Sequence, residues 1–192
     1  PQVRCFDVSE LSVLLERPEF SVLVTEESRQ RRLMYRAEER RRSVMAEDHN
    51  DTISFLQKCH LQIEVFTPKT EKELLRCYEL LTRTNQLNMS GVKYSREEFD
   101  QALQRDGHQS FAFSCGDDFG DYGIVGFGQY IKQQDRLVFR EFAMSCRVAG
   151  KFVESALFAS LLEREHCLQG EMCLIKTKKN VLIRHISPWR QC

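Results

Sequence analysis

The sequence lacks any long uninterrupted apolar run. No apolar segment among its 192 residues is long enough to span a membrane, and the N-terminus does not resemble a signal peptide. The sequence also lacks a net charge, because 28 basic residues balance 28 acidic ones. This balance gives no support to nucleic-acid binding by the domain as a whole. We therefore expect a cytoplasmic protein that needs neither membrane nor nucleic acid as a partner.

Paired cysteine motifs are also missing. The chain has eight cysteines, but no two are separated by two residues, and no spacing of cysteine and histidine matches a zinc site. We interpret the cysteines as reduced thiols, most of them small core residues, and expect neither a structural disulfide nor a metal ion. No Ser, His and Asp arrangement typical of a hydrolase is recognisable, because the five histidines have no acid or nucleophile at a telling spacing.

The most informative stretch is residues 136–163. Residues 137–144 are mostly apolar, which predicts a central strand buried on both faces of a sheet. The apolar residues that follow have helical spacing, which predicts a helix over residues 151–166 lying against that sheet.

The loop of residues 146–151 joins this strand to this helix. We expect its backbone N–H groups to point outward toward an anion such as phosphate, with Arg147 and Lys151 adding positive charge. Cys146 lies at the strand end, where an arginine and a helix N-terminus both favour the thiolate form. Cys146 is therefore a candidate nucleophile for acyl transfer. The alternative is a small buried residue at a crowded strand end.

Glu141 is the second candidate for chemistry. Regular alternation places it on the same strand face as Leu137 and Phe139, and a carboxylate on an apolar face has a raised pKa and can act as a general base. The alternative is an ion pair with Arg140 or Arg147, or an exposed strand edge.

The other patterns predict a mixed α/β domain. The expected strands and helices are strands at 61–66, 110–115, 123–131 and 172–177, and helices at 26–47, 52–59, 70–84 and 95–104. The first of these helices carries seven arginines between Arg29 and Arg42. It is either a basic patch for nucleic acid or an acidic carrier protein, or a solvated face whose acids offset the charge. Gly126 and Gly128 within one strand predict a bulge or a close ligand approach.

Several strings follow one another in a recognisable order. They are Arg83-Thr84-Asn85-Gln86-Leu87-Asn88, Phe119-Gly120-Asp121-Tyr122-Gly123, Met144-Ser145-Cys146-Arg147-Val148-x-Gly150-Lys151-x-Val153-Glu154 and Lys179-Asn180. Within them, Arg147-x-x-Gly150 is similar to the pyrophosphate loop of GNAT acyltransferases. Together the strings resemble the C-terminal half of the FkbH-like proteins, which join a HAD-superfamily phosphatase to a GNAT-like domain. The resemblance covers about residues 20–180.

This resemblance implies an α/β, GNAT-like mixed sheet flanked by helices and preceded by a helical segment. We expect residues 1–50 to hold the tail of a HAD-like domain and a long linker helix, and residues 51–192 to form the GNAT-like domain. The early Asp-x-Asp motif of HAD phosphatases is missing, so the chain resembles a fragment that begins near the end of such a domain. Two splayed central strands would admit the thioester arm.

The resemblance also implies ligands and partners. The expected cofactor is the phosphopantetheine arm of an acyl-carrier protein, or coenzyme A, held by Arg147, Val148, Ala149, Gly150 and Lys151. The expected substrate is a thioester, contacted by Asn85, Asn88, Asp121, Tyr122 and Asn180. Asparagine turn chemistry is the alternative for the first pair, and a plain turn is the alternative for Asp121 and Tyr122.

One position departs from the GNAT pattern. Phe152 stands where that loop usually has Gly or Ala, and its ring would crowd a pyrophosphate. Two functions stay open. The first is an acyltransferase that works on acyl or glyceryl thioesters of a carrier protein, in the making of a methoxymalonyl extender unit for polyketides. The second is a non-catalytic module that docks the carrier for a separate HAD domain.

Overall fold

The computed structural model describes residues 6–10, 12–13, 26–47, 52–172, 174–175, 177–178, 180 and 190–191. In chain order its elements are η1 (Val8–Glu10), α1 (Glu26–Glu47), α2 (Thr52–Lys58), β1 (Gln62–Phe66), α3 (Glu71–Arg83), α4 (Arg96–Leu103), β2 (Gln109–Asp117), β3 (Gly120–Gln133), β4 (Arg136–Met144), η4 (Cys146–Val148), α5 (Val153–Arg164), β5 (Gln169–Met172) and β6 (Arg190–Gln191). Within these ranges, no helix combines the length and apolar character that crossing a bilayer requires.

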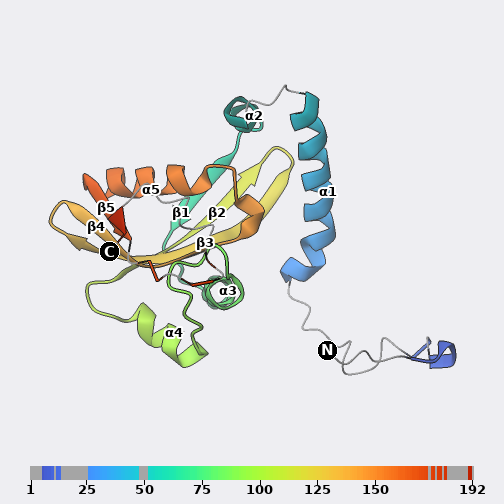
Figure 1. Cartoon of the computed structure of the whole chain (residues 1–192), viewed down its shortest axis with the longest axis horizontal. Coiled ribbons are helices and arrows are strands. Elements are labelled where there is room, and N and C mark those ends of the chain that lie inside the picture. Colours follow the sequence, from blue (N-terminus) through green and yellow to red (C-terminus); the bar gives the residue numbers. More distant parts are fainter. Residues whose placement is uncertain are drawn as a thin grey trace.

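The strands form one mixed sheet in the order β1-β2-β3-β4-β5-β6. Figure 1 labels the strands from β1 to β5. Neighbours from β1 to β4 are antiparallel, whereas β4 and β5 are parallel. A parallel pair needs a crossover connection, which α5 supplies. The predicted mixed α/β sheet flanked by helices, with a helical segment before it, is confirmed.

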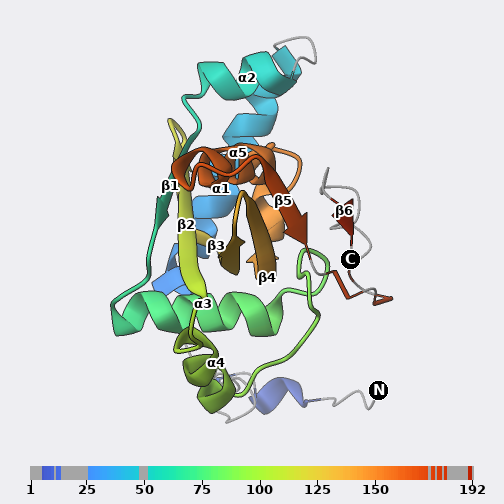
Figure 2. The same cartoon turned by 90° about the vertical axis from the view of Figure 1, so that its left-hand side faces the viewer.

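Helices cover both faces of the sheet (Figure 2). On one face Phe111 and Phe113 pack with Leu157 and Phe158 of α5. On the other face Ala112, between those two phenylalanines, belongs to a core shared with α3 and α4. This alternation follows from the two-residue period of a strand and leaves the middle of the sheet buried on both sides.

The helices α3 and α4 begin where the sequence predicts. Thr70 and Ser95 are their N-caps, and each forms a capping box with the glutamate three residues later. In this arrangement the hydroxyl accepts a bond from the glutamate N–H, and the carboxylate accepts one from the cap N–H.

Gly126 and Gly128 leave room for aromatic rings. A Cβ added at Gly126 would lie 2.0 Å from the Phe113 ring, and one at Gly128 would lie 2.4 Å from the Phe111 ring. The predicted bulge is confirmed beside them, because the β2–β3 register skips Val125. The alternative of a close ligand approach is wrong at both glycines, since phenylalanine occupies the space.

The predicted strand at 172–177 is wrong in position. β5 is Gln169–Met172, and Gly170 lies within it opposite Leu137. Strand pairing begins early because Leu168 N–H already donates to the Asp135 carbonyl. Beyond it, β6 pairs with β5 through Glu171 and Arg190.

Candidate functional site

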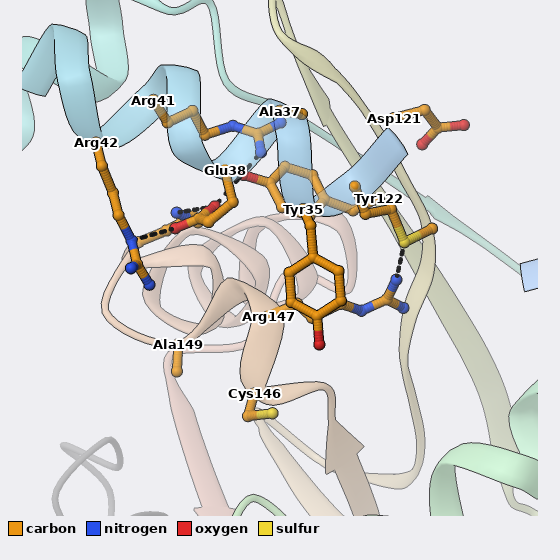
Figure 3. A pocket seen from close by; sticks show the side chains of 12 residues that line it. Tyr35, Ala37, Glu38, Arg41, Arg42, Asp121, Tyr122, Cys146, Arg147 and Ala149 are labelled. Carbon is orange, nitrogen blue, oxygen red and sulfur yellow. Dashed lines mark hydrogen bonds and ion pairs between the residues drawn. The ribbon is translucent and has the colours of Figure 1, made fainter. Parts of the chain in front are cut away.

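A pocket of about 440 Å³ with several charged side chains lies between α1 and the loop that follows β4 (Figure 3). Its lining residues from α1 are Met34, Tyr35, Ala37, Glu38, Arg41 and Arg42, and those from β3 and the loop are Asp121, Tyr122, Cys146, Arg147, Ala149 and Lys151. The sequence-predicted residues Cys146, Arg147, Ala149, Lys151, Asp121 and Tyr122 are thus brought together here. A volume of this size is within the range of small-molecule sites.

The loop is held in place by its own hydrogen bonds. Ser145 N–H donates to the carbonyl of the bulged residue Val125 at 2.7 Å, which ties the loop to β3. The amides of Val148, Ala149 and Lys151 donate to carbonyls three residues earlier. The expectation that the loop amides point outward is therefore wrong for these three, and an anion in this pocket would meet mainly side chains.

The cofactor-binding residues expected of the loop do not behave alike. Arg147, Ala149 and Lys151 face the pocket. Val148 is fully buried in the main core, where it anchors the loop. Gly150 has a positive φ of 73°, a conformation that glycine adopts without strain, and is exposed outside the pocket lining. Cofactor contacts by these residues stay a prediction.

Helix α1 is fastened to the β2–β3 hairpin by a buried ion pair. Arg41 donates to both carboxylate oxygens of Asp117, and its guanidinium lies 4.2 Å from the centre of the Tyr122 ring. The amides of Phe119 and Gly120 also donate to Asp117. This cluster places α1 opposite the loop of residues 146–151, so the predicted linker helix forms one wall of the pocket.

Cys146 differs from the other cysteines that the structure describes. It is exposed, whereas Cys59, Cys77, Cys115 and Cys167 are buried, and all five have free thiols. Burial raises the pKa of Cys77 to about 12 and that of Cys115 to about 11, which disfavours their thiolates. The pocket therefore contains the accessible thiol of this described set, and its alternative as a buried core residue is wrong.

Glu141 lies on the opposite strand face from the one predicted. Phe139 pairs with Tyr130 and Glu141 pairs with Gln129, so Arg140 is an extra residue in β4 and the alternation slips by one. Glu141 therefore points away from the Leu137 and Phe139 face.

Hydroxyl groups surround the buried Glu141 carboxylate. Ser90 donates to it at 2.8 Å, and Tyr94 donates to its other oxygen. The pKa of Glu141 is raised by burial, in the predicted direction, although both hydrogen bonds act the other way. The residue is not among those lining the pocket with Cys146, and its role as a general base stays a prediction.

The expected asparagine contacts have structural partners. Asn88 is fully buried and donates to the Leu81 and Thr84 carbonyls, which closes the end of α3. Asn180 is also fully buried and donates to the Asn88 and Ile175 carbonyls. Asn85 is exposed outside the pocket lining. A substrate role for all three stays a prediction.

The expectation that two central strands splay apart to admit a thioester arm is wrong for β3 and β4. β3 and β4 stay paired as far as Gly126 and Met144. On the other side of β4, pairing with β5 ends at Phe139. Beyond that point the segment Leu87–Met89 pairs with the edge of β4. Met89 N–H donates to the Phe142 carbonyl at 2.8 Å, and Met144 N–H donates to the Leu87 carbonyl at 2.9 Å.

Sequence reasoning missed the α1 side of the pocket. Tyr35, Glu38 and Arg42 belong to the arginine-rich helix, and the sequence patterns treat that helix as a basic patch or a solvated face. Which of its residues face the loop depends on the Arg41–Asp117 pair, whose partners are 76 positions apart. No local pattern encodes a contact at that distance.

Metal ligands are not clustered in the described part of the chain, where no group of three or more His, Cys, Asp or Glu side chains could hold an ion. The donors that surround the pocket are cationic or neutral, apart from Glu38 and Asp121. The chemistry available here is anion binding by Arg and Lys side chains and nucleophilic attack by a thiol.

No family model matches the sequence, and no curated protein matches it. Among solved structures, the chain is similar to the ribosomal-protein-S18-alanine N-acetyltransferase from Escherichia coli, with 14% identity, a TM-score of 0.45, and coverage of 65% of this chain and 74% of that one. It is also similar to L-PGS from Bacillus licheniformis, with 11% identity, a TM-score of 0.36 and coverage of 76% of this chain but only 39% of that one. At such values neither likeness bears on substrate or reaction.

Proposed function

We propose that this chain is a GNAT-like acyltransferase domain that acts on acyl or glyceryl thioesters carried by an acyl-carrier protein. The observation that supports this most is the position of Cys146, whose exposed thiol opens on the same pocket as Arg147 and Lys151. The resemblance to FkbH-like proteins adds the pathway, the assembly of a methoxymalonyl extender unit for polyketides.

In the proposed reaction Cys146 takes the acyl group from the thioester. Its thiolate attacks the carbonyl carbon, a new carbon–sulfur bond forms, and the bond to the pantetheine sulfur breaks. The departing pantetheine thiolate takes up a proton from water. Arg147 and Lys151 hold the phosphate at the other end of the arm, which fixes the carbonyl near the thiol.

A carrier-borne arm suits the pocket better than free coenzyme A. Phe152 follows the loop, is about half exposed, and stands where a small residue would let a pyrophosphate approach. The phosphopantetheine arm has a single phosphate and no nucleotide. It would therefore need the pocket cations without needing room beside Phe152.

Intact-mass measurement tests this function. After mixing with an acetyl or glyceryl thioester of 4′-phosphopantetheine, the wild-type chain should gain the mass of one acyl group, and peptide mapping should place it on Cys146. The Cys146→Ala variant should gain none. Acylation of wild type and Cys146→Ala to the same extent would contradict the proposal, since other thiols would then account for the modification.

A second candidate is a non-catalytic module that docks the carrier for a separate HAD domain. It is favoured by the Leu87–Met89 segment, which hydrogen-bonds the edge of β4 where a thioester arm would otherwise pair. This candidate predicts binding of carrier protein with no acyl-enzyme under the same conditions. The mass experiment, repeated alongside a carrier-binding measurement, separates the two.

A further inference from the structure

Three cationic side chains converge on Glu38 at the edge of the pocket. Its carboxylate oxygens lie 3.4 Å from Arg41 Nη1, 3.8 Å from Arg42 Nε and 3.8 Å from Lys151 Nζ. Two of these cations come from α1 itself and the third comes from the loop, so Glu38 lies at the junction of the two walls. Figure 3 shows Glu38 between the Arg41 and Arg42 side chains.

None of these three contacts is close. Charge-assisted hydrogen bonds between nitrogen and oxygen are about 2.7–2.9 Å long, and Arg41 makes bonds in this range or shorter with Asp117 instead. Arg41 and Lys151 share one Glu38 oxygen and Arg42 approaches the other, and all three distances are longer than a charge-assisted hydrogen bond. A phosphate has more oxygens, arranged tetrahedrally, and can satisfy several donors around it.

Lys151 gives a second, independent indication of an anionic ligand. Its side chain is only 15% exposed, yet within the described part of the chain its ammonium group has no hydrogen bond and approaches only Glu38 and the face of Tyr122. A largely buried ammonium group is normally paired and hydrogen-bonded. Lys151 therefore has donors available in the pocket that its present partners do not use.

We propose that Glu38 holds the position of a ligand's phosphate group, and that a phosphate monoester or diester binds by displacing it. The displaced carboxylate turns toward solvent, to which it is already 34% exposed. The phosphate then bonds Lys151 and Arg42, with Arg147 on the opposite wall. Long ion pairs at a partly exposed site contribute little to stability, so their exchange costs little. This inference rests on the proposed function, since it concerns the same pocket.

Calorimetric titration of the full chain with inorganic phosphate tests this inference. Glu38→Gln removes the competing carboxylate and should tighten binding roughly two- to five-fold, as expected for a partly exposed charge. Glu39→Gln is the matched control, because Glu39 is exposed on the same helix, lies outside the pocket lining and loses the same charge. Its affinity should stay within about twofold of wild type.

Lys151→Gln should weaken phosphate binding about tenfold or more, because it removes a cation that is only 15% exposed and, unlike Arg41, is not bonded to Asp117. Thermal melts of all variants confirm that each is folded. Equal effects of Glu38→Gln and Glu39→Gln, weaker binding by Glu38→Gln, or no binding by any variant would overturn the inference. If inorganic phosphate behaves as predicted while Cys146 is never acylated, the inference stands and the proposed function fails.

Discussion

Arg41 and Asp117 form a bidentate ion pair that joins α1 to the β2–β3 hairpin. Arg41 Nε lies 2.5 Å from Asp117 Oδ2, and Nη2 lies 2.7 Å from Oδ1. Both side chains are almost completely buried, at 5% and 3% exposure. The pocket exists only where this pair places α1 against the loop, so the site depends on a contact between segments far apart in sequence.

Replacement of Arg41 tests this dependence. Arg41→Ala leaves the Asp117 carboxylate buried without its cation and should destabilise the docked state of α1 by about 3–5 kcal/mol. Hydrogen exchange should therefore become much faster in α1 than in β2–β4. Arg40→Ala removes an exposed arginine from the same helix and should leave exchange unchanged. Equal protection of α1 in both variants would show that the pair does not hold the helix.

Gly126 should not tolerate a methyl group. Gly126→Ala would push a Cβ into the Phe113 ring at 2.0 Å, and overpacking of this kind costs about 1–3 kcal/mol. Gly116→Ala is the control within the same sheet, because its added Cβ would meet nothing closer than 4.0 Å. Urea unfolding of the two variants should differ by at least about 1 kcal/mol. A Gly126→Ala protein as stable as Gly116→Ala would contradict the ring packing.

The protein should be more stable with glycine at position 152 than with alanine at that position. It has φ 55° at the N-cap of α5, a left-handed conformation that costs a residue with a Cβ about 1–2 kcal/mol. Phe152→Gly and Phe152→Ala both remove the ring, so the comparison isolates the backbone. We expect the glycine variant to be more stable by about 1 kcal/mol in urea unfolding. Ordinary helix propensity predicts the reverse order, and that order would refute the left-handed cap.

Glu141 should make stability depend on pH. Its folded-state pKa is raised by burial, so between the ordinary carboxyl pKa and the raised value the folded chain binds more protons than the unfolded chain. The contribution of Glu141 to protein stability should therefore be greatest below the ordinary carboxyl pKa and should fall as pH rises through the raised pKa. Glu141→Gln keeps a partner for Tyr94 and Ser90 and should lack this loss. Parallel pH profiles for both proteins in denaturant unfolding would show that Glu141 does not titrate as described.

The sequence predicts local features well and their juxtaposition poorly. The helix starts near residues 70 and 95 and the buried strand before Cys146 depend on neighbouring residues, and each is confirmed. The face of Glu141 depends on a bulge at Arg140, which β3 imposes from across the sheet.

The same limit applies to the site. The loop residues Cys146, Arg147 and Lys151 could be found from the strand–loop–helix pattern, but Glu38 and Tyr35 could not. Phe152 departs from the GNAT loop pattern in sequence, and the structure gives the physical reason why glycine suits that position, its positive φ.

Binding of 4′-phosphopantetheine is the most direct test of the central claim, that the pocket between α1 and the loop holds the arm of a carrier protein. Calorimetry should compare phosphopantetheine with pantetheine, which lacks the phosphate, on wild type and Arg147→Ala. We predict that wild type binds phosphopantetheine several-fold more tightly than pantetheine, and that Arg147→Ala, still folded, loses most of this difference. Equal affinity of wild type for the two compounds would contradict the account.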